Sequence, residues 1–259
     1  MNDAIGQLSA TTTAGFMLVL GRVGPLFLLA PALSSRAMPA RARGVAAVAI
    51  ALGLTPFALR GQRIPLDAVS LGVLMGKEVL VGLAFAYAVG AVVAAVSVAG
   101  SLLDSVTGYA YASLVDPVNG TQGGPIGQLY ALVAAIVFIA VDGDHWLVEG
   151  VARTYQLVPL HGMPSFTALT AGVEHAFTGI FTSAVAVAAP VLLAVTITDV
   201  GFGLVSRVVP QMNVFAVGFP VKILVALLML AASLPFTAGW LVDATRSAIE
   251  TGSQMVGAR

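Results

Sequence analysis

The sequence predicts an all-α membrane protein, and three observations lead to this prediction. Of the 259 residues, 58% are hydrophobic and only 9% are charged, whereas soluble domains carry about 25% charged residues. Apolar runs recur along the chain, and several reach or exceed the roughly 20 residues that an α-helix needs to cross a bilayer core. The sequence lacks the segments of about 10 residues with alternating polarity that form membrane β-barrels.

Six apolar helical segments are expected, and we assign them to a single integral membrane domain over residues 1–259. The second and fourth are short for a bilayer span, whereas the third and fifth are long enough to bend or to project beyond it. Arginines in the connections divide five against four between the two sides, so the positive-inside rule does not fix the orientation. The segments lie at about 14–33, 45–59, 68–103, 126–141, 176–206 and 213–242.

The third segment has a carboxylate inside its apolar run, Glu78, and a ridge of small residues. Glu78 precedes the ridge by four residues, so it lies on the same helix face, while Lys77 points about 100° away around the helix. One interpretation is a charged pair near the headgroups; the other is a carboxylate that faces a partner or a pore. Small ridges let membrane helices approach closely. This ridge consists of Gly82, Ala86, Gly90 and Ala94.

A structured loop is expected between the third and fourth segments, over residues 104–129. Asp116-Pro117 and Asn119-Gly120 are turn dipeptides, and Gly123-Gly124-Pro125 ends any helix before the next apolar run. The loop therefore separates two helices by a turn-rich connection.

The fifth segment ends at a polar interruption. Asp199 and Arg207 are eight residues apart, so they share a face if the helix continues between them. Pro210 ends the helix because it lacks an amide donor and biases the preceding residue away from helical angles. We expect the side chains of Gln211 and Asn213 to satisfy the exposed backbone groups.

A second break is expected at Pro220, inside the start of the sixth segment, with the charge of Lys222 just beyond it. The stretch between the two breaks, residues 214–219, is too short to span a bilayer. Broken backbone at membrane depth is tolerated only where protein covers it or water reaches it.

Nothing in the sequence predicts catalysis, a cofactor or a metal site. Asp142-Gly143-Asp144 lacks the first glycine of the Gly-x-Gly-Asp pattern of intramembrane aspartyl proteases, because Val141 occupies that position. The three histidines are 16 and 14 residues apart and have no metal-ligand spacing. Cysteine is absent and the formal net charge is zero, which argues against thiolate chemistry and nucleic-acid binding.

Three stretches together resemble the FliR family of type III secretion export-gate proteins. The most specific is VVPQMNVF at 208–215 followed by GFPVK at 218–222. Residues 22–31, with Ser35-Arg36 and Pro39-Ala40-Arg41, are similar to the first hairpin of the family. DPVNGTQGGPIGQ at 116–128 is similar to its central loop.

The resemblance implies a non-enzymatic component of the flagellar basal body in the bacterial inner membrane. Its helical hairpins would pack with FliP-like and FliQ-like subunits into a hetero-oligomeric gate for unfolded flagellar proteins, and FlhB-like and FlhA-like export proteins would associate with it. Candidate gate or subunit-interface residues are Glu78, Gly82, Ala86, Gly90, Asp116, Pro117, Asp199, Arg207, Pro210, Gln211, Asn213, Phe215, Gly218, Pro220 and Lys222.

Three alternatives remain open at this point. A subunit of a virulence injectisome would have the same family signature. A secondary transporter also uses broken helices, with Glu78, Asp199 and Lys222 as a relay, although no second Pro-Gln-x-Asn break occurs in the first half of the chain. A membrane scaffold without a conduit is the third alternative.

Overall fold

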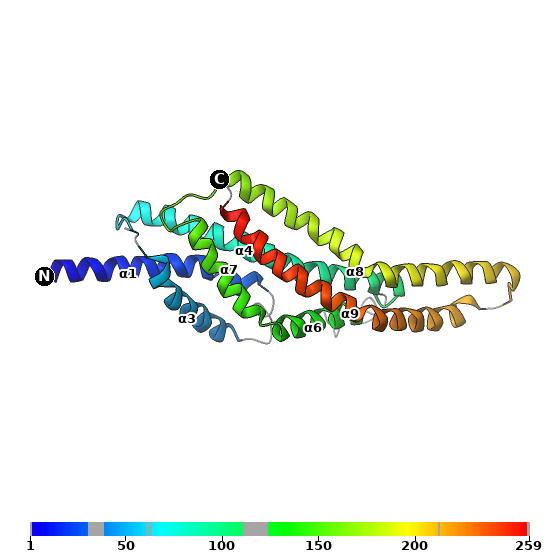
Figure 1. Ribbon diagram of the computed structural model, residues 1–259. Coiled ribbons are helices and arrows are strands. Elements are labelled where there is room, and N and C mark those ends of the chain that lie inside the picture. Colours follow the sequence, from blue (N-terminus) through cyan, green and yellow to red (C-terminus); the bar gives the residue numbers. More distant parts are fainter. Residues whose placement is uncertain are drawn as a thin grey trace. The chain divides into compact units, whose positions relative to one another are not determined.

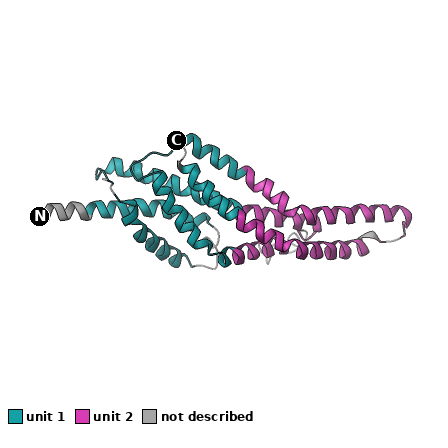
Figure 2. Ribbon diagram, in the orientation of Figure 1, with its two compact units in different colours: residues 1–92, 138–177, 244–259 teal, residues 93–137, 178–243 magenta. Residues whose placement is uncertain are grey.

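The computed structural model describes residues 2–30, 39–60, 62, 64–110, 124–211 and 213–257. Every regular element in these residues is a helix (Figure 1), as the composition predicts. The chain divides into two compact units (Figure 2). Unit 1 comprises residues 1–92, 138–177 and 244–259, and unit 2 comprises residues 93–137 and 178–243.

The N-terminal helices belong to unit 1. Helix α1 covers Asn2–Val23 and the short α2 covers Leu26–Leu29. Together they give one candidate span, Ala10–Leu29, so the predicted segment at 14–33 is one apolar span with an interruption, and its residues 31–33 lie outside the described residues. The interruption is at Gly24-Pro25, where proline supplies no amide donor. Helix α3, Ala40–Ala58, follows Pro39 and packs beside α1 (Figure 1).

Helix α4 covers Ala68–Thr107, close to the predicted 68–103. Asp67 caps its start, because the Oδ2 atom accepts a hydrogen bond of 2.9 Å from the amide of Ser70. Hydrogen bonds from Ser70 lower the pKa of the Asp67 carboxyl. The helix ends where Gly108 adopts a φ of +93°, the left-handed conformation common just after a helix.

Helices α6, Pro125–Ala140, and α7, Gly143–Leu157, form a bent pair with an angle of 71° between them. Helix α7 lies between the fourth and fifth predicted segments, in residues 142–175, where no helix is predicted from the sequence. Helix α7 is amphipathic rather than continuously apolar, and it buries Leu147, Val151 and Tyr155 at four-residue spacing. A search for long apolar runs therefore overlooks it.

The last two helices are the longest. Helix α8 covers Phe166–Val208 and α9 covers Val214–Gly257, so both extend well beyond the predicted 176–206 and 213–242. The break predicted at Pro220 is wrong, because Pro220 lies inside α9. A proline removes one amide donor, and a membrane helix tolerates that loss where its surroundings compensate.

Among the described residues, five helices are long and apolar enough to cross a membrane, or six if the bent pair α6 and α7 counts as one span. Unit 1 has a continuous apolar core to which α1, α2, α3, α4 and α7 contribute. Its largest buried side chains include Leu18, Phe85, Leu147 and Leu160. This core surrounds the polar cluster described next.

Candidate functional site

A buried ion network lies within unit 1. Glu78 on α4 has 0% of its surface exposed, and its two oxygens accept hydrogen bonds from the Nε and Nη2 atoms of Arg22 on α1. The Nζ atom of Lys77 lies 2.6 Å from the Oε1 atom of the same carboxylate. Two cations thus share one carboxylate away from water.

Polar groups of α7 and of the residues just after it complete the network. The Nη1 atom of Arg22 donates to the hydroxyl of Thr154, and its Nη2 atom also donates to the carbonyl of Val158 at 2.9 Å. Lys77 donates to the carbonyls of Pro159 and Leu160, at 3.2 and 2.6 Å. Since buried charges are stable only when paired and hydrogen-bonded, these contacts tie α1, α4 and the end of α7 together.

These contacts bear on the two interpretations of Glu78. The charged pair with Lys77 is present, but it is buried inside the protein, and the carboxylate faces a partner within its own chain. Its partner is Arg22, which the sequence analysis did not single out, although an arginine inside an apolar run is as costly as a glutamate. Although Lys77 points about 100° away from Glu78 around the helix, its ammonium reaches the same carboxylate.

The ridge of small residues packs against the chain itself. A Cβ atom on Gly82 would overlap the carbonyl oxygen of Arg22, and one on Gly90 would lie 2.8 Å from the carbonyl oxygen of Leu29. Ala86 is fully buried. The ridge thus provides the close approach that small residues allow in membranes, and at Gly82 and Gly90 this approach is to the N-terminal helices of the same chain.

The interruption at residues 209–213 is the turn of a helical hairpin between α8 and α9. Helix α8 ends at Val208, two residues before Pro210, as predicted. The Oδ1 atom of Asn213 accepts a hydrogen bond of 3.1 Å from the amide of Ala216, which makes Asn213 the N-cap of α9. The side chain of Gln211 is exposed and has no hydrogen bond within the described residues.

An ion pair joins the two arms of this hairpin within unit 2. The Nζ atom of Lys222 on α9 lies 2.7 Å from the Oδ2 atom of Asp199 on α8. The Asp199 side chain remains 49% exposed, and that of Lys222 is 19% exposed. Arg207 is exposed near the turn, so Asp199 pairs across the hairpin rather than along its own helix.

The surface around this ion pair is apolar. Gly218 is buried and faces the ring of Phe202, while Pro220 is exposed. The side chain of Phe215 lies outside the described residues, as do Asp116 and Pro117. Large apolar side chains point outward along both arms, among them Leu193, Ile197, Val200, Leu204, Val208, Leu224, Leu227 and Leu228.

Asp104, a buried aspartate near the end of α4, is not among the site residues predicted from the sequence. The Oδ1 and Oδ2 atoms of Asp104 accept hydrogen bonds from the amides of Ile126 and Gly127, at 3.0 and 2.9 Å. Helix α6 starts at Pro125, as the Gly-Gly-Pro sequence predicts, and Asp104 satisfies its free amides from another helix. Close packing of Gly100 against Gly127 permits this contact.

The long apolar helices define the class of protein: a multi-helical integral membrane protein, with one ion network in its interior and one half-exposed ion pair on a hairpin. The profile of the family "Bacterial export proteins, family 1" matches residues 13–248. The chain belongs to this family.

Individual relatives agree with this assignment. The flagellar biosynthetic protein FliR of Bacillus subtilis is 32% identical over 219 residues, which are 83% of this chain and 84% of that protein. FliR of Escherichia coli is 26% identical over 84% of this chain and 83% of its own length. The surface presentation of antigens protein SpaR of Salmonella typhimurium is 29% identical over 87% of this chain and 83% of its own length.

The family and these relatives identify the chain as a membrane-embedded component of a type III protein export gate. The sequence resemblance to FliR is therefore confirmed, and so is the all-helical membrane fold. Other components of an export apparatus are its partners.

Proposed function

We propose that the chain is the FliR-type subunit of a flagellar export gate in the bacterial inner membrane. It joins FliP-like and FliQ-like subunits around a channel for unfolded flagellar proteins, and FlhB-like and FlhA-like proteins associate with the gate. Its role is structural, without a catalytic step of its own. The single observation that carries this proposal is the half-exposed Asp199–Lys222 ion pair on an apolar hairpin.

The physical argument begins with the cost of a charge in lipid. An aspartate at the centre of a membrane helix costs about 2.5–3.5 kcal/mol on insertion scales. Asp199 lies nine residues before the end of α8, about 13 Å along the helix from the turn. Lys222 neutralises it only on one side. A neighbouring subunit or a water-filled channel on the open side of Asp199 would remove this cost.

We place the candidate interface on the hairpin accordingly. It includes Asp199, Lys222, Arg207, the turn at 210–213 and the outward apolar side chains of both arms. Apolar and small residues drive packing between membrane helices, and polar groups add hydrogen bonds across the contact. By contrast, Gly82 and Gly90 already contact the chain's own backbone, so we assign them to folding rather than to a subunit contact.

Two observations weigh on the alternatives. FliR of Bacillus subtilis is 32% identical to this chain, which favours the flagellar assignment. FliR of Escherichia coli is 26% identical, below SpaR at 29% and the Yop translocation protein T of Yersinia pestis at 28%, so an injectisome subunit stays the alternative. The transporter hypothesis rested on broken helices with Glu78, Asp199 and Lys222 as a relay. Pro220 lies inside a continuous α9, which removes one of the expected breaks, and Glu78 is fully buried and paired with Arg22 and Lys77.

The test is co-purification from cells that also produce the FliP-like and FliQ-like subunits encoded in the same genome. The full chain should recover both partners in mild detergent, and Asp199→Leu should reduce this recovery by about tenfold, because it leaves Lys222 without its anion. Glu174→Gln provides the control, since it removes an exposed carboxylate from α8 outside the hairpin. Recovery of neither partner by the unaltered chain would refute the proposal.

A further inference from the structure

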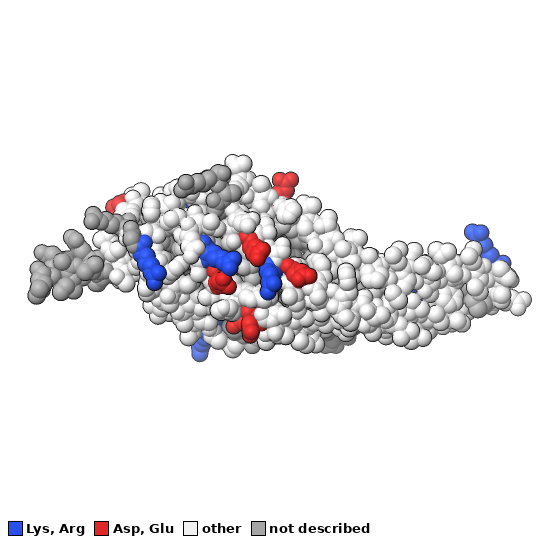
Figure 3. Space-filling model, in the orientation of Figure 1, with Lys and Arg blue, Asp and Glu red and all other residues white. Residues whose placement is uncertain are grey.

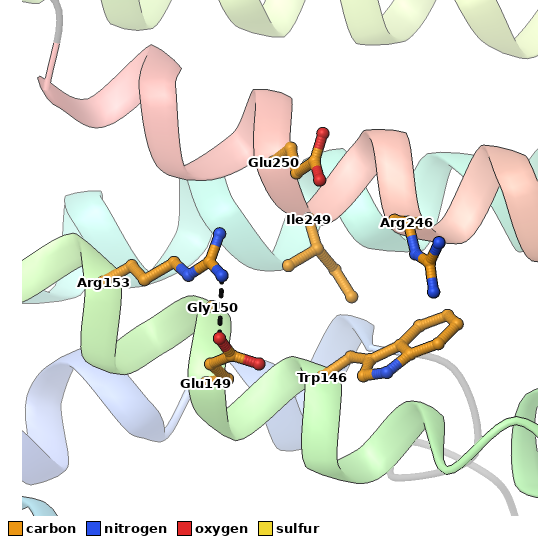
Figure 4. Close-up of a pocket in the computed structure, with 7 residues that line it drawn as sticks. All are labelled: Trp146, Glu149, Gly150, Arg153, Arg246, Ile249 and Glu250. Atoms are coloured by element: carbon orange, nitrogen blue, oxygen red, sulfur yellow. Dashed lines mark hydrogen bonds and ion pairs between the residues drawn. The ribbon is translucent and has the colours of Figure 1, made fainter.

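A small open pocket lies within unit 1 between α7 and the last turns of α9 (Figure 4). Its volume is about 180 Å³, the space of about six water molecules in the liquid. The face of the molecule seen in Figure 3 carries side chains of both charges gathered over unit 1. Residues that line the pocket are Trp146, Glu149, Gly150, Arg153, Arg246, Ile249 and Glu250.

Close packing fixes the floor of this pocket. A Cβ atom on Gly150 would lie 2.7 Å from side-chain atoms of both Ile249 and Phe85. The glycine therefore lets α7 approach α9 closely, and the two helices hold the polar side chains around the opening in a defined arrangement. Such preorganisation lowers the cost of binding.

One cation and one anion in the pocket, Arg246 and Glu250, form no ion pair within the part of the chain that the structure describes. Glu149 and Arg153 pair at 2.7 Å, one turn apart on α7. The guanidinium of Arg246 instead lies 4.9 Å from the ring centroid of Trp146, a cation–π contact that fixes its plane. Within the described residues, neither Arg246 nor Glu250 forms an ion pair. The site thus offers free hydrogen-bond donors and free carboxylate oxygens within about one helical turn.

The end of the apolar run on α9 puts the pocket near the headgroup layer. This run ends near residue 242, just before Asp243, although the helix itself continues to Gly257. Arg246 follows the end of the run by four residues, a rise of about 6 Å along the helix. The headgroup layer is about 5–7 Å thick on each side of the hydrocarbon core. Tryptophan is enriched at this level.

We propose that this pocket binds the zwitterionic headgroup of a phospholipid with a primary ammonium. Arg246 donates hydrogen bonds to the phosphate oxygens, and the carboxylates of Glu250 and Glu149 accept from the ammonium. Arg153 remains with Glu149 and limits repulsion between the two carboxylates. An anionic headgroup without an ammonium would meet the same carboxylates unfavourably, so the mixed charges select a zwitterion. This inference is independent of the export-gate proposal.

The experiment uses the full chain purified in detergent, with native mass spectrometry to measure retained lipid. Phosphatidylethanolamine should bind about tenfold more tightly than phosphatidylglycerol, because only phosphatidylethanolamine has an ammonium that donates charged hydrogen bonds to the two carboxylates. Arg246→Ala should weaken phosphatidylethanolamine binding about tenfold. Glu250→Gln should mainly remove the preference over phosphatidylglycerol. Arg60→Ala is the matched control, since Arg60 is also exposed and lies 5.6 Å from the ring centroid of Phe57.

Arg246 and Glu250 are exposed, so both variants should fold, and helical circular dichroism checks this. Equal binding of the two lipids would overturn the proposal, as would equal losses for Arg246→Ala and Arg60→Ala. Free phosphoethanolamine that binds as tightly as the lipid would assign the pocket to a soluble ligand instead. If Arg246→Ala releases a co-purified protein while lipid retention is unchanged, the pocket is a protein contact and the headgroup proposal fails.

Discussion

Replacement of Glu78 by glutamine should destabilise the chain strongly. The substitution leaves two buried cations, Arg22 and Lys77, without an anion. They keep the hydroxyl of Thr154, the ring of Tyr155 and backbone carbonyls, all of which are uncharged. Removal of one partner from a buried ion pair costs about 3–5 kcal/mol, because the remaining charge stays in a low-dielectric interior. At about 2–4 °C per kcal/mol for chains near this size, the expected fall in melting temperature is about 6–20 °C.

The assay is loss of helical circular dichroism on heating the purified chain in one detergent. Glu149→Gln is the matched control: it breaks a Glu–Arg pair in which both side chains are about half exposed, and such pairs contribute about 0–1 kcal/mol. Lys77→Met should cost less than Glu78→Gln, because it leaves Arg22 and Glu78 as a neutral pair. If Glu78→Gln melts within about 2 °C of the unaltered chain, the buried-charge reasoning is wrong.

Three further substitutions test other contacts by the same melting assay. Asn213→Ala removes the N-cap of α9 and should cost about 0.5–2 kcal/mol; a larger loss would mean that the turn has a further role. Gly90→Leu adds a Cβ atom 2.8 Å from the carbonyl oxygen of Leu29 and should cost about 1–3 kcal/mol by overpacking, and a neutral result would contradict that contact. Asp104→Ala leaves the amides of α6 unpaired and should cost about 1–3 kcal/mol, whereas Asp104→Asn should recover part of this loss.

The sequence predicted elements whose cause is local. Composition and apolar run length identified the membrane helices, and Pro210 and Asn213 marked the end of one helix and the cap of the next. Helix α7 was missed because its apolar positions recur at intervals of four among polar residues, a pattern that a run-length criterion does not detect.

Partners distant in sequence could not be predicted. The cost of burying Glu78 was evident from its apolar surroundings, but its partner Arg22 is 56 residues away, and nothing local to either residue specifies the pair. The same applies to Asp104 and the amides of α6. Arg22 and Asp104 could both have been selected by one criterion, an ionisable residue inside or at the end of an apolar run. The break predicted at Pro220 was wrong because a proline alone does not end a membrane helix.

The two ion pairs in apolar helices are satisfied to different extents, and this difference supports the proposed role. Glu78 has every oxygen engaged by cations of its own chain and no exposed surface, so the fold alone meets its cost. Asp199 has one cation and leaves half of its side chain open on an apolar hairpin. Because an open carboxylate inside a membrane is unfavourable against lipid, we propose that protein or channel water lies beside this hairpin surface, as a multi-subunit gate would provide.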